Sequence, residues 1–149
     1  MRQLRLVVLL ISALVAMQAA DPVVGRWHLN LQKSRYDPGP APKSQTRIYR
    51  EEGGEVKAVV TTVYKNGNSD TVYYPANYDG KEHPVSGSPD TDGILMTRID
   101  EYTSESILSH AGHTVGKARR TVSSDGQTMT ITFNGSDVNN LAYYEKEKE

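Results

Sequence analysis

Cysteine is absent from all 149 residues of the sequence. Disulfide bonds are therefore excluded, and so is a bacterial lipid anchor, which is attached to a cysteine. Many small secreted domains depend on disulfides for stability, so this chain has to be held together by its hydrophobic core. It is long enough to form one such core without covalent help.

A basic excess is also missing. The chain has 17 lysines and arginines against 18 aspartates and glutamates. Removal of residues 1–20 takes away Arg2 and Arg5 and changes the formal net charge from −1 to −3. The densest remaining basic run, Lys117–Arg120, is short and is typical of ordinary strand charge. The sequence therefore argues against a nucleic-acid partner.

Common catalytic motifs are absent as well. There is no Gly-x-Ser-x-Gly, no His-Glu-x-x-His and no phosphate-binding loop. Acidic residues cluster in turns, as at Asp79, Asp92 and Asp125, where turn geometry alone explains an aspartate. We therefore predict no catalytic residue and no cofactor.

Two histidines, His110 and His113, flank Ala111-Gly112 and would face each other across a two-residue hairpin loop. A stable metal site needs three or four ligands, and no third ligand lies nearby in the sequence. We therefore predict no metal site.

Long hydrophobic runs occur only at the N-terminus. Arg2 and Arg5 precede an apolar run from Leu6 to Met17, and Ala19-Ala20 follows it. This order is typical of a secretory signal peptide, and the run is short for a membrane span, which needs about 20 apolar residues. We predict a signal peptide at 1–20, cleaved after Ala20, and a secreted or periplasmic protein without a remaining membrane span. The alternative is an uncleaved N-terminal anchor.

Glycines recur every 13 residues, at Gly54, Gly67, Gly80 and Gly93. Each lies in a turn-like cluster, and the segments between them are rich in Val, Thr, Tyr and Ile. Tight reversals at near-constant spacing predict consecutive antiparallel strands. A long meander usually protects its edges by closing on itself. The sequence therefore predicts one all-β domain over 21–149, an up-and-down antiparallel meander closed into a barrel.

About ten strands are expected. They fall near residues 23–30, 45–51, 55–64, 69–76, 81–86, 94–100, 104–110, 113–122, 127–133 and 139–146. The segment 31–44 differs, because its prolines at 38, 40 and 42 remove backbone donors. It predicts a polyproline-like surface crossover, preceded by at most one helical turn within 32–36.

Motifs at both ends of the predicted barrel carry a resemblance to known proteins. Gly25-Arg26-Trp27 starts the first strand, and Tyr143-Tyr144-Glu145-Lys146 ends the last one. With the ten-strand meander, they resemble the calycins, the group of lipocalins and fatty-acid-binding proteins. The resemblance implies a lipocalin-like barrel in which Trp27 is a structural plug at the closed end and Tyr144 is part of an anchor for a ligand carboxylate.

The chain departs from the calycin pattern in two places. Ala142 stands where an arginine usually accompanies the C-terminal tyrosine, and the proline-rich crossover stands where fatty-acid-binding proteins have a helical lid. A closer resemblance, carried by Gly25–Asn30, Lys33-Ser34 and Tyr78–Lys81, is to small secreted bacterial proteins of unknown activity.

Either Arg119 or Arg120 should point into the barrel. A two- or four-residue loop at Ser123–Gly126 would place Arg120 on the inner face, and a three-residue loop would place Arg119 there. Apolar matching through Ala118 and Val122 favours Arg120. A buried guanidinium needs an anionic or strong acceptor partner. That partner is either a ligand carboxylate or phosphate, or an aspartate or glutamate of the chain itself.

The predicted function is binding of a small hydrophobic or amphipathic ligand in the barrel, with Arg120, Tyr74 and Tyr144 as polar contacts. Tyrosine buries apolar area while keeping a polar tip, although it also suits strands in general. One alternative is a barrel filled by side chains that acts as a protein-interaction or envelope-associated module. A hydrolase or isomerase that uses the same cavity is a third.

Overall fold

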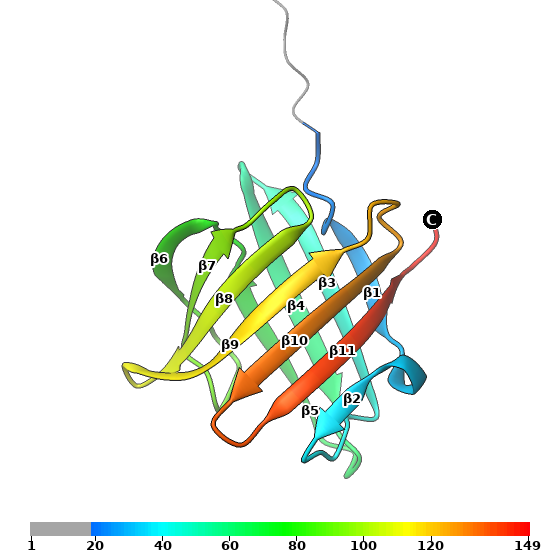
Figure 1. The fold of residues 1–149 in the computed structure, drawn as a ribbon, viewed down its shortest axis with the longest axis vertical. Coiled ribbons are helices and arrows are strands. Elements are labelled where there is room, and N and C mark those ends of the chain that lie inside the picture. Colours follow the sequence, from blue (N-terminus) through cyan, green and yellow to red (C-terminus); the bar gives the residue numbers. More distant parts are fainter. Residues whose placement is uncertain (1–18) are drawn as a thin grey trace, which may run out of the picture.

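The computed structural model describes residues 19–149, so most of the predicted signal peptide, residues 1–18, lies outside the described residues. Ten strands form a continuous antiparallel sheet in the order β5-β4-β3-β1-β11-β10-β9-β8-β7-β6. The sheet curls into a barrel (Figure 1). The predicted fold class, an all-β antiparallel meander closed into a barrel, is therefore confirmed.

The predicted strands correspond to ten observed ones. They are β1 (Gly25–Leu29), β3 (Ser44–Glu52), β4 (Glu55–Val63), β5 (Ser69–Pro75), β6 (Asp79–Pro84), β7 (Gly93–Arg98), β8 (Thr103–His110), β9 (His113–Val122), β10 (Thr128–Gly135) and β11 (Asn139–Lys146).

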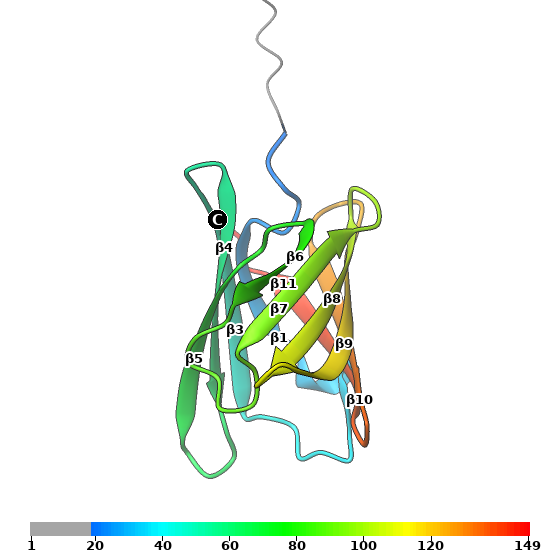
Figure 2. The ribbon, with the colours of Figure 1, turned by 90° about the vertical axis from the view of Figure 1, so that its left-hand side faces the viewer.

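Two seams of different strength close the barrel. The first strand, β1, pairs with β3 on one side and with the last strand, β11, on the other. Where β5 meets the β6 side of the barrel, the only pairing among residues 19–149 is the isolated bridge of Tyr73 with Ser86, which follows β6. Its two backbone hydrogen bonds measure 2.9 and 3.0 Å. Figure 2 shows the side of the barrel that carries β6 and β7. The barrel is therefore tightly closed at its chain ends and loosely closed at β5–β6.

Of the four glycines that the spacing assigns to turns, two lie in turns. Gly54 and Gly67 lie in hairpin turns with φ of +81° and +87°. Gly80, however, lies inside β6, and Gly93 begins β7 without a positive φ. A Cβ on Gly93 would lie 2.4 Å from Ser109 Oγ, so Gly93 is required by the close approach of neighbouring groups rather than by a turn.

The crossover after β1 is more structured than its prolines predict. A single 3₁₀ turn, Leu31–Lys33, is capped by the Asn30 side chain, which accepts a hydrogen bond from Lys33 N. After this turn a short strand, β2 (Arg35–Asp37), pairs with β11. The prediction of one helical turn within 32–36 followed by a polyproline-like crossover did not include β2. Residues 35–37 are extended because β11 offers a free edge there. Among residues 19–149 we find no helix long and apolar enough to cross a membrane.

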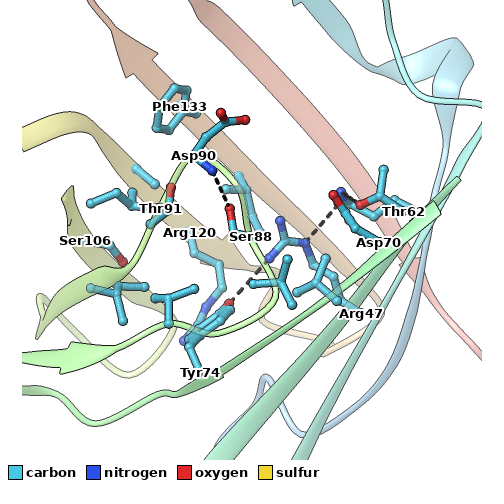
Figure 3. Close-up of a pocket in the computed structure, with 18 of the residues that line it drawn as sticks. Arg47, Thr62, Asp70, Tyr74, Ser88, Asp90, Thr91, Ser106, Arg120 and Phe133 are labelled. Carbon is cyan, nitrogen blue, oxygen red and sulfur yellow. Dashed lines mark hydrogen bonds between the residues drawn. The ribbon is translucent and has the colours of Figure 1, made fainter. Parts of the chain in front are cut away.

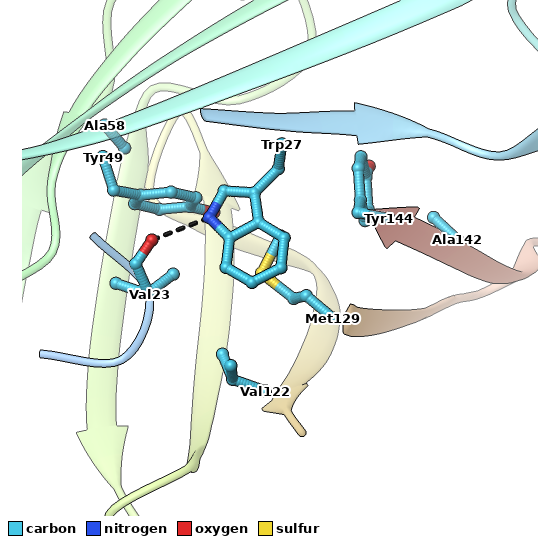
Figure 4. Close-up of a cluster of buried hydrophobic side chains, with 8 residues drawn as sticks. All are labelled: Val23, Trp27, Tyr49, Ala58, Val122, Met129, Ala142 and Tyr144. Atoms are coloured by element: carbon cyan, nitrogen blue, oxygen red, sulfur yellow. Dashed lines mark hydrogen bonds between the residues drawn. The ribbon is translucent and has the colours of Figure 1, made fainter. Parts of the chain in front are cut away.

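The largest apolar cluster fills one end of the barrel around Trp27, whose side chain is fully buried. The indole Nε1 donates a 2.7 Å hydrogen bond to the carbonyl oxygen of Val23, which is also fully buried (Figure 4). The N-terminal segment thus folds across this end before β1 begins. Met129, Tyr49 and Tyr144 complete the wall around the indole.

Candidate ligand-binding site

The barrel encloses a cavity of about 300 Å³ beyond this apolar cluster. That volume lies at the lower end of the range for small-molecule sites. Its apolar lining includes side chains from strands around the whole barrel: Val60, Val72, Ile94, Met96, Leu108, Ile131 and Phe133. Its polar lining combines two arginines, Arg47 and Arg120, and tyrosines such as Tyr74 with uncharged and acidic side chains (Figure 3).

Arg120 points into the barrel, as the loop argument predicts. In the observed register Arg120 pairs with Ile131, and the neighbouring pairs are Val122 with Met129 and Ala118 with Phe133. Its side chain is only 7% exposed, whereas Arg119 lies outside and pairs with Glu105 at 2.7 Å.

The hydrogen bonding of Arg120 is incomplete. Its Nη2 donates to the hydroxyl of Tyr78, and its Nε is buried without a hydrogen-bond partner in the described part of the chain. The guanidinium carbon also lies 5.3 Å from the ring centre of Tyr49, within the range of a cation–π contact.

A second arginine, Arg47 on β3, reaches the same cavity. Its Nε donates to Gln45 Oε1 at 3.2 Å and to the Tyr144 hydroxyl at 3.0 Å. Its Nη1 contacts the hydroxyls of Tyr49 and Tyr74 at 3.5 and 3.4 Å, which is long for an N–H···O hydrogen bond. The guanidinium therefore keeps donor capacity toward the cavity.

Neither interior arginine has a carboxylate partner. Within residues 19–149 no aspartate or glutamate lies within ion-pair distance of Arg47 or Arg120. Asp21 is linked to Arg120 only indirectly, because the Tyr78 hydroxyl donates to Asp21 Oδ2 at 2.9 Å and that carboxylate forms its ion pair with Arg98. The two interior guanidinium groups thus contact hydroxyls, aromatic rings and the amide oxygen of Gln45, and none of these partners is charged.

The two guanidinium groups shift the pKa values of nearby tyrosines. Burial by itself would raise the pKa of Tyr49, but the charges of Arg47 and Arg120 outweigh it and lower the pKa below the usual value. Burial dominates for Tyr74, whose hydroxyl lies 3.2 Å from that of Tyr49, and its pKa is raised. Burial also raises the pKa of Tyr144, although Arg47 opposes the shift.

The cavity mouth carries the opposite charge. Asp70 and Asp90 line it, together with Tyr64, whose hydroxyl donates to Asp70 at 2.7 Å. Asp90 is exposed and belongs to the loop between β6 and β7, which crosses the cavity in Figure 3. The site therefore has an acidic rim and a basic interior.

The structure brings together three of the residues predicted as ligand contacts. Tyr74 and Arg120 line the cavity. Tyr144 does not line it; it is buried in the apolar cluster and reaches the site through its hydroxyl, which accepts from Arg47. Trp27, predicted as the plug, lies in the neighbouring apolar cluster. Whether any of these residues contacts a ligand stays a prediction.

Sequence reasoning missed Arg47. The signal was present in the alternation of β3, where Gln45, Arg47 and Tyr49 are two residues apart and share one face. The alanine at 142 was a second signal, since it removes the arginine expected beside Tyr144. Arg47 approaches the Tyr144 hydroxyl from β3, and so supplies from a different strand the guanidinium that β11 lacks.

The histidine pair forms as the hairpin argument predicts, with His110 opposite His113. His110 Nδ1 lies 3.8 Å from Asp92 Oδ2. Over the described range 19–149, no group of three or more His, Cys, Asp or Glu side chains is placed to hold a metal.

Comparisons of sequence give no relative: no family model matches the chain, and no curated protein matches it. Comparisons of structure do. A Schistosoma mansoni fatty-acid-binding protein in complex with arachidonic acid superimposes with a TM-score of 0.63 at 14% identity, over 85% of this chain and 97% of that one. A variant of the fluorescent protein UnaG gives a TM-score of 0.57 at 12% identity, over 88% of this chain and 100% of that one. At such low identity the likeness establishes the fold alone, and by its fold this chain is a barrel of the fatty-acid-binding-protein type.

Proposed function

We propose that this protein is a secreted or periplasmic carrier that binds a small, partly apolar anion inside the barrel. The observation that carries the proposal is the presence of two interior arginines without a carboxylate partner. A charge removed from water is costly unless it is paired and hydrogen-bonded. An anionic ligand would supply the missing partner to Arg47 and Arg120.

The cavity also has an apolar share. Val60, Ile94, Leu108 and Phe133 contribute to its wall, and Val60 lies directly opposite Arg47 in the β3–β4 pairing. Burial of apolar surface contributes about 25 cal/mol per Å², so a hydrocarbon portion would add affinity that a purely polar anion lacks. The amphipathic ligand class follows from this combination of a charged interior and an apolar wall.

The acidic rim supports one orientation of the ligand. A negatively charged head group is repelled by Asp70 and Asp90 at the mouth and attracted by the arginines beyond them. We therefore expect the head group to enter first and the apolar tail to lie toward the mouth. The fatty-acid-binding protein with the similar fold was crystallised with arachidonic acid, which agrees with an elongated anionic amphiphile as the ligand.

An empty interior favours this proposal over a barrel filled by side chains. A filled barrel would have no cavity of about 300 Å³, and no ligand would balance unpaired charges in its interior. The proposal of export rests separately on the predicted signal peptide at 1–20.

Isothermal titration with three probes of equal chain length tests the proposal. We expect dodecanoate to bind, and dodecanol and dodecyltrimethylammonium to bind at least about tenfold more weakly, because a charge-assisted hydrogen bond contributes about 1.5–3 kcal/mol. Equal affinity for all three probes would show that the site is a nonspecific apolar pocket.

Replacement of Arg47 tests whether this residue binds the carboxylate of dodecanoate. Arg47→Met should weaken dodecanoate binding about tenfold to a hundredfold, since the methionine keeps most of the packing and removes the charge. Arg119→Met is the matched control, because Arg119 lies outside the barrel and pairs with Glu105. Unchanged affinity in Arg47→Met would remove this arginine from the site.

A further inference from the structure

Two buried polar atoms in this barrel have no hydrogen-bond partner among residues 19–149: Arg120 Nε and Ser104 Oγ. They belong to adjacent strands at directly opposed positions, since Ser104 on β8 pairs with Arg120 on β9. Ser104 is 1% exposed and Arg120 is 7% exposed. Of the two residues, Arg120 lines the cavity. Buried polar groups in folded proteins are nearly always satisfied, so the unpaired Nε of Arg120 indicates a missing acceptor.

This unsatisfied region is separate from the hydrogen-bonded group around Arg47. The Arg47 guanidinium is held by Gln45 and Tyr144 on one side of the tyrosine pair Tyr49–Tyr74. Arg120 is held from the other direction by Tyr78. Two guanidinium groups therefore flank the same tyrosine pair, and each retains donors of its own.

A count of charges follows from this arrangement. One negative charge compensates one of the two guanidinium groups and leaves the other unpaired in the interior. The carboxylates at the rim do not fill the gap, because Asp70 accepts from Tyr64 and Asp90 is exposed to solvent. The lowered pKa of Tyr49 agrees with this count, since it reflects two cations acting on one phenol.

We infer that the ligand carries two negative charges on one compact head group, attached to a single apolar chain. This inference rests on the proposed function and narrows it from anionic amphiphiles in general to dianionic ones. The head group is either a phosphate monoester or a pair of neighbouring carboxylates, because both present several acceptor oxygens within a small volume. One part of it accepts from Arg47 and another accepts from Arg120.

Dodecyl phosphate and dodecyl sulfate make a matched pair for the test. They share the chain length and the tetrahedral head and differ in charge, because the second pKa of a phosphate monoester is about 6. Titrated at pH 7.5 below their micelle concentrations, dodecyl phosphate should bind about tenfold to a hundredfold more tightly. At pH 5 the advantage should disappear. Dodecylsuccinate against dodecanoate asks the same question with carboxylates in place of phosphate.

Variants of Arg120 test whether this residue binds the second negative charge of the head group. Arg120→Met should abolish the advantage of dodecyl phosphate while dodecyl sulfate keeps its affinity through Arg47, and Arg120→Lys should restore part of the advantage. Urea titration of each variant verifies that it is folded. If Arg120→Met does not fold, the comparison of phosphate with sulfate at two pH values in the unaltered protein still decides the question.

The outcomes separate this inference from the proposal beneath it. Equal affinity for sulfate and phosphate at pH 7.5 would overturn the dianionic head group and leave the anionic carrier standing. A preference for phosphate that persisted in Arg120→Met would also overturn it. If dodecanoate, dodecyl sulfate and dodecyl phosphate all failed to bind, both the carrier and the dianionic ligand would be wrong.

Discussion

At the scale of single residues, the interior of this barrel is governed by tyrosine and arginine in place of phenylalanine and tryptophan. Nine tyrosines are present against one Phe and one Trp. Tyrosine can pack its ring in the core and still offer a hydroxyl to a guanidinium, and Tyr49, Tyr74 and Tyr144 do so for Arg47. The buried charge of Arg120 and the partly buried charge of Arg47 are tolerated because phenol groups surround them.

These buried phenols make the fold sensitive to alkali. The pKa is raised to about 12 for Tyr36 and is also raised for Tyr74, Tyr78 and Tyr144, in each case mainly by burial. Above about pH 10, the usual tyrosine pKa, the unfolded chain loses these protons while the folded chain keeps them. The folded state then binds more protons, so the free energy of unfolding must fall as pH rises.

We therefore expect the urea midpoint to decrease from about pH 10 to about pH 12. The lowered pKa of Tyr49 acts in the opposite direction, but it is one group against five, since the pKa of Tyr64 is also raised. Urea titrations followed by circular dichroism at each pH measure the change, with tyrosinate absorbance as the record of ionisation. A constant midpoint across this pH interval would contradict the burial of the phenols.

The sequence predicts part of this site. The placement of Arg120 inside the barrel follows from whether the β9–β10 loop has an even or odd number of residues, because the apolar residues at 118 and 122 identify the buried face. Arg47 escapes prediction because the alternation of β3 groups it with Gln45 and Tyr49 but does not show which face of the strand is the inner one. Its role depends on contacts with Tyr144, which is 97 residues away. Long-range contacts of this kind follow from barrel closure, which no local pattern encodes.

At the scale of elements, the hairpins follow local sequence and the exceptions follow tertiary contacts. The alternation of apolar residues predicts β10 well, since its inner and outer positions are two residues apart. β2 is missed because its three residues lie in a proline-rich segment and gain their structure only by pairing with β11. Gly93 is misassigned to a turn for a similar reason, because the demand for glycine comes from Ser109 on the next strand.

The weak seam between β5 and β6 depends on one glycine. Gly87 has φ +84°, and a Cβ there would lie 2.0 Å from the backbone oxygen of Thr71. Gly87→Ala should cost about 2–3 kcal/mol or more, because positive φ strains alanine and the clash displaces the strand that carries the Tyr73–Ser86 bridge. Urea denaturation measures the loss.

Gly112→Ala is the matched control for that substitution. Gly112 has a similar φ of +80°, but nothing lies within 4 Å of its added Cβ. Its cost should be limited to backbone strain, about 1 kcal/mol. An equal loss in both variants would show that the contact between Gly87 and β5 does not contribute to closure.

At the scale of the whole molecule, the barrel has one solid end and one hollow end. The N-terminal segment and Trp27 fill the solid end (Figure 4), and Arg47, Arg120 and Tyr74 line the hollow part. Tyr49 and Tyr144 connect the two parts, because both belong to the Trp27 cluster and both hydroxyls contact Arg47. This division separates stability from binding, so a substitution at the plug should lower stability and leave affinity for a ligand largely unaffected.

Trp27→Phe tests that separation. The change removes the indole N–H that donates to the Val23 carbonyl and leaves a buried acceptor unpaired, which costs about 1–3 kcal/mol, in addition to the loss of packing. We expect a lower urea midpoint with an affinity for dodecanoate within about twofold of the unaltered protein. Tyr73→Phe, at a side chain that is 52% exposed, should change stability by less than about 0.5 kcal/mol.

The pairing of β1 with β11 also sets the order in which the protein is able to fold. Leu29 pairs with Tyr144, so the contact closes a loop of more than a hundred residues and contributes to a high contact order, which slows folding. Hairpins from β3 to β10 can form as soon as each is synthesised, but β1 has no second neighbour until the last strand emerges. A nascent or truncated chain that lacks β11 would therefore expose one edge of β1, and completion of the barrel has to wait for residues Asn139–Lys146.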